Sequence, residues 1–127
     1  MRKAFVSYNY ENRELAHNVN TLLPLNIIEA LIIHVNSNTK SLIDKEIRIS
    51  IKESNIVVFI IGNNSHNSPW INREAELAIS MNKPILCIRY PETTGSTPQK
   101  LVKCDILDWD ANTVHISIKN MIRDLVP

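Results

Sequence analysis

The chain has 127 residues, of which 44% are hydrophobic and 21% charged, and its formal net charge is +1 at pH 7. These values are typical of a single globular domain, residues 1–127, with a core of its own. They exclude a dedicated nucleic-acid surface, which needs a basic excess, and no apolar stretch is long enough to span a bilayer.

The numbers of cysteines and glycines narrow the possible protein classes further. Two cysteines, Cys87 and Cys104, and an N-terminus unlike a signal peptide predict a cytoplasmic protein with reduced thiols. The chain holds two glycines, so it offers no glycine-rich phosphate loop and no dinucleotide-binding fingerprint.

The first half of the chain alternates strands and helices. In order, the expected elements are strand Lys3–Tyr8, helix Arg13–Leu23, strand Ala30–Val35 and helix Ile43–Glu53. In the last of these, Ile43, Ile47 and Ile51 recur every four residues, which is the spacing of an amphipathic helix. On its other face, Asp44 and Arg48 are spaced for an ion pair.

The stretch 56–88 predicts a strand, a loop, a helix and a second strand. Ile56–Ile61 is continuously apolar and β-branched, as expected of a strand that is buried on both faces of a parallel sheet. Ser68 can cap the following helix, and Pro69 suits the first helical position, where a missing N–H costs nothing. Pro84–Ile88 predicts the next strand, so the stretch is a βαβ unit.

The C-terminal part predicts a surface loop, Tyr90–Gln99, a short strand, Lys103–Leu107, and a helix, Thr113–Leu125, capped by Asp110 or Asn112. The core positions expected in this helix are Ile116, Met121, Ile122 and Leu125. The whole pattern predicts an α/β fold of flavodoxin-like type. We expect a three-layer sandwich whose five-stranded parallel sheet has the order 2-1-3-4-5 and helices on both faces.

One acidic residue is placed unusually in the helix that follows Pro69. At about 100° per residue, Glu74 lies roughly 30° from the mean direction of the apolar side chains, whereas Glu76 lies roughly 170° away. Burying a carboxylate costs several kcal/mol unless it is paired. Glu74 is therefore a candidate functional residue near the carboxyl edge of the sheet, or a helix glutamate whose stem follows the core edge while its carboxylate reaches solvent.

The loops at this edge lack the residues of several common sites. No acidic pair follows the first strand, as a phosphoacceptor receiver needs, and only Ser7 is there to bind an FMN phosphate. A P-loop and a G-x-S-x-G turn are absent. The histidines are far apart and lack ligand spacing, so no metal site is expected. What remains is a polar cleft with Tyr8, Trp70 and Glu74, which suits a flat, hydroxyl-bearing ligand such as a nucleotide, although both aromatic residues also suit plain packing.

Several segments together resemble a TIR domain over nearly the whole chain. Residues 5–8, Phe-Val-Ser-Tyr, are similar to the Phe-x-Ser-Tyr of the family's first box. Residues 68–74 match its most specific motif, Ser-x-Trp-x-x-x-Glu. Residues 43–61 resemble its second helix and third strand, and residues 83–86, Lys-Pro-Ile-Leu, resemble its Gly-Lys-Pro-Ile segment. Asn36–Ser41 lacks the Arg-Asp-x-x-Pro-Gly pattern of many animal and plant members, and the last helix lacks their Phe-Trp box. The chain is thus most similar to the bacterial TIR-like group that includes the Thoeris antiphage proteins.

The resemblance implies an enzyme that cleaves NAD between nicotinamide and ribose, with NAD as the substrate and no cofactor. Glu74 corresponds to the family's catalytic glutamate. Ser7, Tyr8 and Asn9 are expected beside the nicotinamide and ribose, and Trp70 at the pocket wall. The product would be ADP-ribose or a cyclic or conjugated nucleotide that acts on a separate effector in bacterial antiphage defence.

The resemblance also implies self-association, in which Asn36–Ser41 of one copy closes the pocket of another. Two further functions fit the same residues. One is a TIR-like scaffold that associates with other TIR domains and does no chemistry, and the other is a sensor that binds a nucleotide without cleaving it. A buried, salt-bridged Glu74, with Tyr8 and Trp70 packed over an absent pocket, would favour the scaffold.

Overall fold

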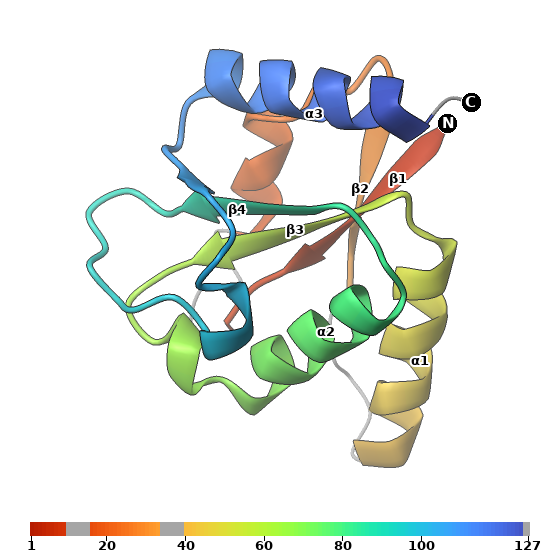
Figure 1. The fold of residues 1–127 in the computed structure, drawn as a ribbon, viewed down its shortest axis with the longest axis vertical. Helices are drawn as coiled ribbons and strands as arrows, with labels where there is room; N and C mark the ends of the chain where they lie inside the picture. Colours follow the sequence, from red (N-terminus) through yellow and green to blue (C-terminus); the bar gives the residue numbers. More distant parts are fainter. Residues whose placement is uncertain (10–15, 34–39, 126–127) are drawn as a thin grey trace.

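The structure of the chain is a computed structural model that describes residues 1–9, 16–33 and 40–125. Figure 1 shows how strands and helices alternate along the chain. In order, the elements are β1 (Arg2–Ser7), η2 (Ala16–Thr21), β2 (Ile28–Ile32), α1 (Lys40–Glu53), β3 (Ile56–Ile61), η3 (Ser65–Asn67), α2 (Pro69–Ser80), β4 (Ile85–Arg89), η4 (Gln99–Leu101), β5 (Ile106–Leu107) and α3 (Ala111–Leu125). No helix within these ranges is long and apolar enough to cross a membrane.

The strands of the described residues form one five-stranded parallel sheet in the order β2-β1-β3-β4-β5. This order confirms the flavodoxin-like prediction. All six residues of β3 are buried, because a strand at the centre of a parallel sheet is covered on both faces. The arrowheads of β1, β3 and β4 point to the same side in Figure 1, so the loops that follow these strands gather at one edge.

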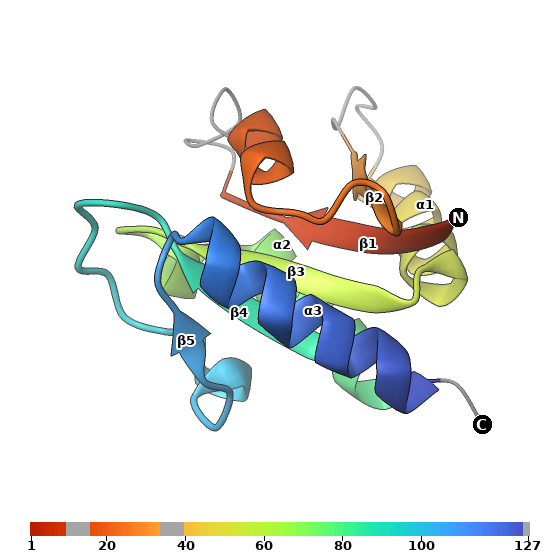
Figure 2. The same ribbon diagram turned by 90° about the horizontal axis from the view of Figure 1, so that it is seen from above.

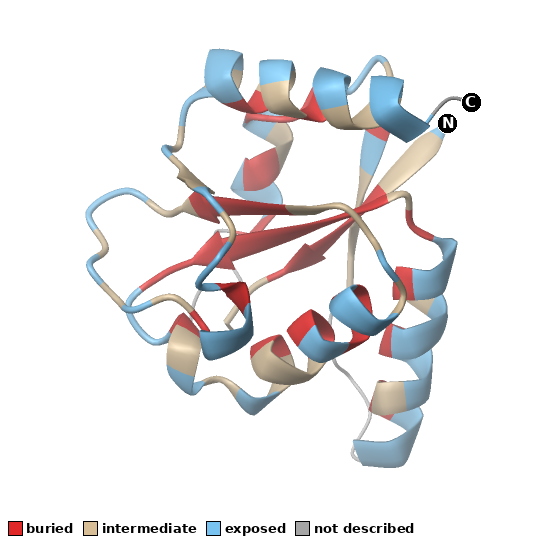
Figure 3. Ribbon diagram, in the orientation of Figure 1, coloured by how far each residue is buried: buried red, intermediate tan, exposed pale blue. Residues whose placement is uncertain are grey.

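The two faces of the sheet have separate cores. The even-numbered residues of β3 pack against η2 and α3, and its odd-numbered residues pack against α1 and α2, since successive side chains of a strand point to opposite faces. Figure 1 shows α3 above the sheet with α1 and α2 below it, and Figure 2 shows α3 crossing in front of β3 and β4. In Figure 3 the buried residues follow the strands and the inner faces of the helices.

The segment after β1 differs from its prediction. The sequence predicts an α-helix over Arg13–Leu23, but the part from residue 16 onward forms the 3-10 helix η2. The Thr21 hydroxyl donates to the Asn18 backbone carbonyl oxygen at 2.7 Å, and Thr side chains compete in this way with α-helical hydrogen bonds. The expected apolar anchors that the structure describes are nevertheless buried, namely Val19, Leu22 and Leu23.

Two edge strands also differ in their bounds. The prediction Ala30–Val35 is wrong at both ends, because β2 begins at the fully buried Ile28 and ends at Ile32; residues 34 and 35 lie outside the described ranges. The prediction Lys103–Leu107 is too long. The Cys104 N–H donates to the carbonyl oxygen of Leu101 at 3.0 Å, so these residues form a turn after η4 and β5 keeps two residues. The remaining elements agree with their predicted bounds to within three residues.

Two of the four core positions that the sequence predicts for α3 are correct. Ile116 is 62% exposed and Leu125 is 40% exposed, so both predictions are wrong. The buried residues are Val114 and Ile118, which lie one turn apart on the face opposite Ile116, and Leu125 lies at the last position of the helix. The other two expected residues do pack against the core, namely Met121 and Ile122. Asp110 caps this helix, since its carboxylate accepts the Thr113 N–H at 2.9 Å.

The Lys83 ammonium joins the end of α1 to the turn after α2. Its Nζ donates to the carbonyl oxygens of Lys52 at 2.9 Å and Ser54 at 2.8 Å. The last carbonyl groups of a helix have no partner within it, and a positive charge is favourable there. Lys83 therefore holds the two helices of this layer in position at the amino edge of the sheet.

We expect Lys83→Met to lower the free energy of unfolding by about 1–2 kcal/mol, because two carbonyl groups lose a charged donor. Urea denaturation followed by circular dichroism measures this change. The matched control is Lys103→Met, at an exposed lysine, which should change stability by less than about 0.5 kcal/mol. Equal stabilities for the two variants would contradict the role of Lys83.

Candidate active site

The residues at the start of α2 define where this helix begins. The Ser68 Oγ accepts a hydrogen bond from the Ile71 N–H at 3.2 Å, and a proline occupies the first helical position, as the sequence predicts. Ala75 and Ala78 are fully buried on the face toward the sheet. Their small side chains let the helix lie close to the sheet, and Glu74 lies on the same buried stripe.

The Glu74 carboxyl is buried at the carboxyl end of β1. Its residue is 6% exposed, and the hydroxyl of Ser7, the last residue of β1, donates to Glu74 Oε1 at 3.1 Å. None of the described basic side chains forms an ion pair with it. Glu76 is exposed and pairs with Arg73 at 3.0 Å. The choice of Glu74 over Glu76 as the inward-facing residue is confirmed.

Burial changes the acidity of Glu74. Loss of hydration disfavours the charged form and raises the pKa of this carboxyl to about 8, while the hydrogen bond from Ser7 lowers it and so offsets part of the effect. The free protein therefore holds Glu74 largely protonated at neutral pH. A cation placed beside the carboxyl would favour its ionised form.

Tyr8 lies apart from this pair. Successive residues at the end of a strand point to opposite faces of the sheet, so Tyr8 packs against the core on the side of η2 and α3. Its hydroxyl donates to the carbonyl oxygen of Ile33 at 3.1 Å. The structure thus brings Ser7 and Glu74 together and places Tyr8 on the other face.

Hydrogen bonds join the loops after β1, β3 and β4. The Asn9 amide donates to the carbonyl oxygen of Asn64 at 3.1 Å, and the side-chain oxygen of Asn63 accepts the Thr94 N–H at 3.0 Å. A Cβ at Gly95 would clash with two carbonyl oxygens of the loop after β3. The loop after β4 is therefore packed on the loop after β3, a close contact that requires glycine.

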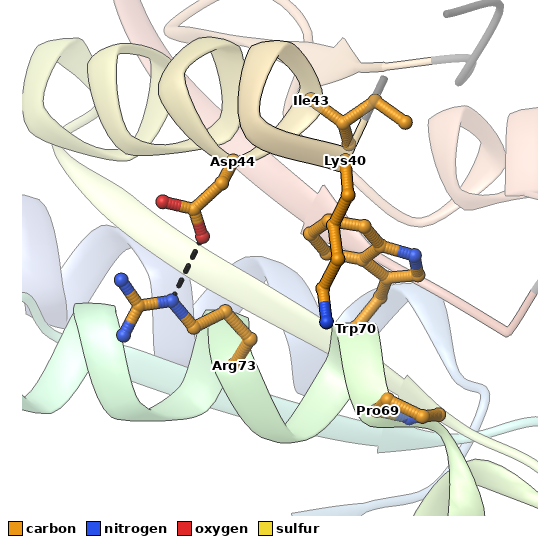
Figure 4. A pocket seen from close by; sticks show the side chains of 6 residues that line it. All are labelled: Lys40, Ile43, Asp44, Pro69, Trp70 and Arg73. Carbon is orange, nitrogen blue, oxygen red and sulfur yellow. Dashed lines mark hydrogen bonds and ion pairs between the residues drawn. The ribbon is translucent and has the colours of Figure 1, made fainter. Parts of the chain in front are cut away.

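A pocket of about 610 Å³ opens between the first turns of α1 and α2 (Figure 4). The residues that line it are Lys40, Ile43, Asp44, Pro69, Trp70 and Arg73. In Figure 4 the Lys40 and Trp70 side chains lie on one side, and the Asp44–Arg73 pair lies on the other. Trp70 is thus a pocket residue, whereas Glu74 lies outside the lining, one turn further along α2.

The sequence reasoning misses most of this lining. The predicted pair of Asp44 and Arg48 is confirmed at 3.1 Å. Asp44 also accepts a hydrogen bond from Arg73 of the other helix at 2.9 Å, and no sequence pattern relates these two residues. The Arg73 guanidinium holds the pKa of the Asp44 carboxyl below its usual value, partly against desolvation, and Arg48 adds to this effect.

Other reactive side chains of the described residues form no second site around Glu74, although the Cys87 and Cys104 thiols lie close enough to interact. Across residues 1–9, 16–33 and 40–125, no group of three histidine, cysteine or acidic residues could hold a metal ion. Cys87 and Cys104 are free thiols. The Ser7–Glu74 pair and the pocket beside Trp70 therefore define the candidate site.

Comparison with known proteins gives one family. A model described as "TIR domain" matches residues 4–119. No curated protein matches the chain.

Several solved structures have the same fold. The TIR domain of the Toll-related receptor TRR-2 from Hydra magnipapillata has a TM-score of 0.63 and 18% identity, over 98% of both chains. A prokaryotic SEFIR domain has a TM-score of 0.63 and 14% identity, over 96% of this chain and 92% of that one. The RPS4 and RRS1 TIR domain heterodimer has a TM-score of 0.58 and 14% identity, over 98% and 96%. At these identities the likeness shows the fold.

The burial of Glu74 predicts a stability that depends on pH. Because its pKa is about 8 when folded and near 4.5 when unfolded, the folded chain binds the extra proton between these values. Stability therefore falls as pH rises through this window and levels off above it. Between pH 6 and pH 9 the loss attributable to Glu74 is about 3 kcal/mol.

Between pH 6 and pH 9 we expect the free energy of unfolding of Glu74→Gln to fall by about 3 kcal/mol less than that of the wild type, since an amide does not titrate. Urea denaturation at both pH values measures the difference. Glu76→Gln, on the exposed face of the same helix, should follow the wild type. Parallel pH curves for the wild type and Glu74→Gln would show that the Glu74 carboxyl is not desolvated in solution.

Proposed function

The chain belongs to the TIR domain family, and we propose that it cleaves NAD at the bond between nicotinamide and ribose, with Glu74 as the catalytic carboxylate. One observation carries the proposal, namely a buried carboxyl at the carboxyl edge of a parallel sheet with no described basic partner. Ionisation of a carboxyl buried in this way costs several kcal/mol unless a positive charge offsets it. A cationic ligand would supply the missing partner, and the nicotinamide ring of NAD is cationic.

The proposed reaction needs one anionic group. The bond between the ribose carbon and the nicotinamide nitrogen breaks, its electron pair stays on the nitrogen, and nicotinamide leaves neutral without a general acid. The ribose then resembles an oxocarbenium ion, which an ionised Glu74 stabilises. Water adds to the ribose carbon and releases a proton, which gives ADP-ribose, whereas an internal nucleophile gives a cyclic product.

The other residues act on either side of this carboxyl. Ser7 holds the carboxylate through its 3.1 Å hydrogen bond and favours the ionised form. We propose that Asn9 and Trp70 contact the substrate, because both lie on segments at the carboxyl edge of the sheet. Tyr8 supports the loop after β1 from the opposite face, through its hydrogen bond to Ile33.

We further propose that the product is a signal nucleotide for a separate effector, and that the reaction serves bacterial antiphage defence of the Thoeris type in the cytoplasm. The resemblance to the bacterial TIR-like group supports this role. We also propose that the chain self-associates. Association between TIR domains is seen in the heterodimer of the RPS4 and RRS1 TIR domains. Of the expected closing loop, Asn36–Ser41, residues 36–39 lie outside the described ranges.

The second candidate is a scaffold that acts through association alone. The burial of Glu74, which is 6% exposed and absent from the lining of the pocket, favours it. Two observations favour the enzyme instead, since Glu74 has no described salt bridge and Trp70 lines a pocket. Turnover of NAD separates the two functions.

We expect the purified protein at high concentration to convert NAD into nicotinamide, and Glu74→Gln to reduce kcat about 100-fold or more, because the charge at the reacting carbon is lost. Mass spectrometry of the products measures turnover and distinguishes ADP-ribose from a cyclic isomer. Glu76→Gln is the matched control and should keep full activity. Absence of turnover by the wild type, including at the highest protein concentrations and with phage lysate added, would favour the scaffold or a sensor that binds a nucleotide without cleaving it.

The rate should also depend on the ionisation of Glu74. We expect kcat/KM to rise tenfold per pH unit up to a pKa of about 8, since this parameter reports the free protein. The pKa seen in kcat should be lower, because bound substrate brings a positive charge to the carboxyl. Ser7→Ala removes the hydrogen bond that lowers this pKa, so its kcat/KM profile should move to higher pH. An unchanged profile in Ser7→Ala would exclude Glu74 as the titrating group.

A further inference from the structure

The pocket between α1 and α2 contains one cation that no described carboxylate neutralises. Arg73 is occupied twice, because it donates to Asp44 at 2.9 Å and to Glu76 at 3.0 Å. Lys40 lines the same pocket and forms no ion pair with the described residues. The charge left for a ligand in this pocket is therefore that of Lys40.

The position of Lys40 in its helix adds to the positive potential. It is the first residue of α1, and the first turn of this 14-residue helix holds no acidic side chain. The start of a helix carries a partial positive charge and free N–H groups, so a lysine is repelled there and an anion is favoured. The helix dipole and the Lys40 ammonium thus favour the same kind of ligand.

The rest of the lining suits a flat, partly apolar group. Ile43, Pro69 and Trp70 form the apolar part of the wall, and Lys40 and Trp70 line the same pocket in Figure 4. On the helical wheel Trp70 lies between Arg73 and Glu74, which are about 60° and 40° away on opposite sides. On the surface of α2, Trp70 therefore lies between the pocket side and the side of Glu74.

We infer that Lys40 binds the phosphate groups of a nucleotide whose body lies against Trp70. If the proposed function holds, this nucleotide is NAD, and its diphosphate lies at Lys40 while its nicotinamide-bearing ribose faces Glu74. The geometry fits, because Trp70 and Glu74 are four residues apart, about 6 Å along the helix axis, which is the length scale of one sugar ring. Arg73 shapes the pocket through Asp44 and does not contact the phosphates.

Binding of ADP-ribose tests this inference without any turnover. ADP-ribose carries the diphosphate and lacks the bond that the proposed reaction breaks. The chain has two tryptophans, so Trp109→Phe leaves Trp70 as the single indole, and its fluorescence reports binding at the pocket. Adenosine, which has no phosphate, is the matched ligand.

In this background we expect Lys40→Met to weaken ADP-ribose binding about tenfold, the effect of one charged contact, and to reduce its salt dependence. Adenosine binding should stay unchanged, and Lys40→Arg should restore ADP-ribose binding. The control is Lys45→Met, at an exposed lysine on the same helix, which should bind as the parent does.

The outcomes separate this inference from the proposed reaction. Equal ADP-ribose affinities for Lys40→Met and Lys45→Met, or a Trp70 signal that saturating ADP-ribose leaves unchanged, would overturn the inference. Binding that depends on Lys40, in a protein that never cleaves NAD, would refute the reaction and retain the site. Cleavage of NAD with the same KM in Lys40→Met and the parent would refute the site and retain the reaction.

Discussion

The contact between Ser7 and Glu74 joins the sheet to the α2 layer at the place where all the proposed chemistry would occur. A parallel sheet has to be covered on both faces, and two buried alanines of α2 bring this helix close to the sheet. A carboxyl on the same stripe is then desolvated whatever its role. The Ser7 hydroxyl is its one described hydrogen-bond donor. In the free protein the Glu74 carboxyl is therefore most stable in its neutral form, and its ionisation costs free energy.

That cost gives the proposed reaction a physical logic. An uncharged Glu74 is compatible with a folded resting protein, and an ionised Glu74 is stabilised only when positive charge arrives. A cationic nicotinamide riboside group would bring such a charge, so binding of the substrate and ionisation of the carboxyl would be coupled. The burial of Glu74 is also compatible with the scaffold function. In the free protein, a carboxyl that never contacts a ligand would be buried in the same way as a catalytic one.

The neighbouring pocket favours an anionic group, whereas an ionised Glu74 favours a cationic one. Arg73 pairs with two carboxylates and bridges α1 and α2, so among the described lining residues Lys40 is the cation without a carboxylate partner. Trp70 lines this pocket one helical turn before Glu74. A ligand that is cationic at one end and anionic in the middle would match Glu74 on α2 and Lys40 on α1, and NAD has this character.

The sheet order, the start of α2 and the inward direction of Glu74 could all be predicted from the sequence. These features depend on local patterns, namely the alternation of strands and helices, the Ser68 cap and the helical period, and they do not require knowledge of distant contacts. The ends of the edge strands, the 3-10 form of η2 and the exposed Ile116 were decided by tertiary packing, because side-chain competition and the position of a helix over the sheet override propensity.

Three contacts of the site could not be predicted from the sequence: the pair of Asp44 with Arg73, the hydrogen bond between Asn9 and Asn64, and the pocket that Lys40 and Trp70 share. These residues belong to segments far apart in the chain, and no periodicity encodes which loops meet at the carboxyl edge of a sheet. The tertiary structure also separated Tyr8 from Ser7, since neighbours at the end of a strand point to opposite faces. Local sequence therefore determined which residue is buried, and the packing of α1, α2 and the loops determined what surrounds it.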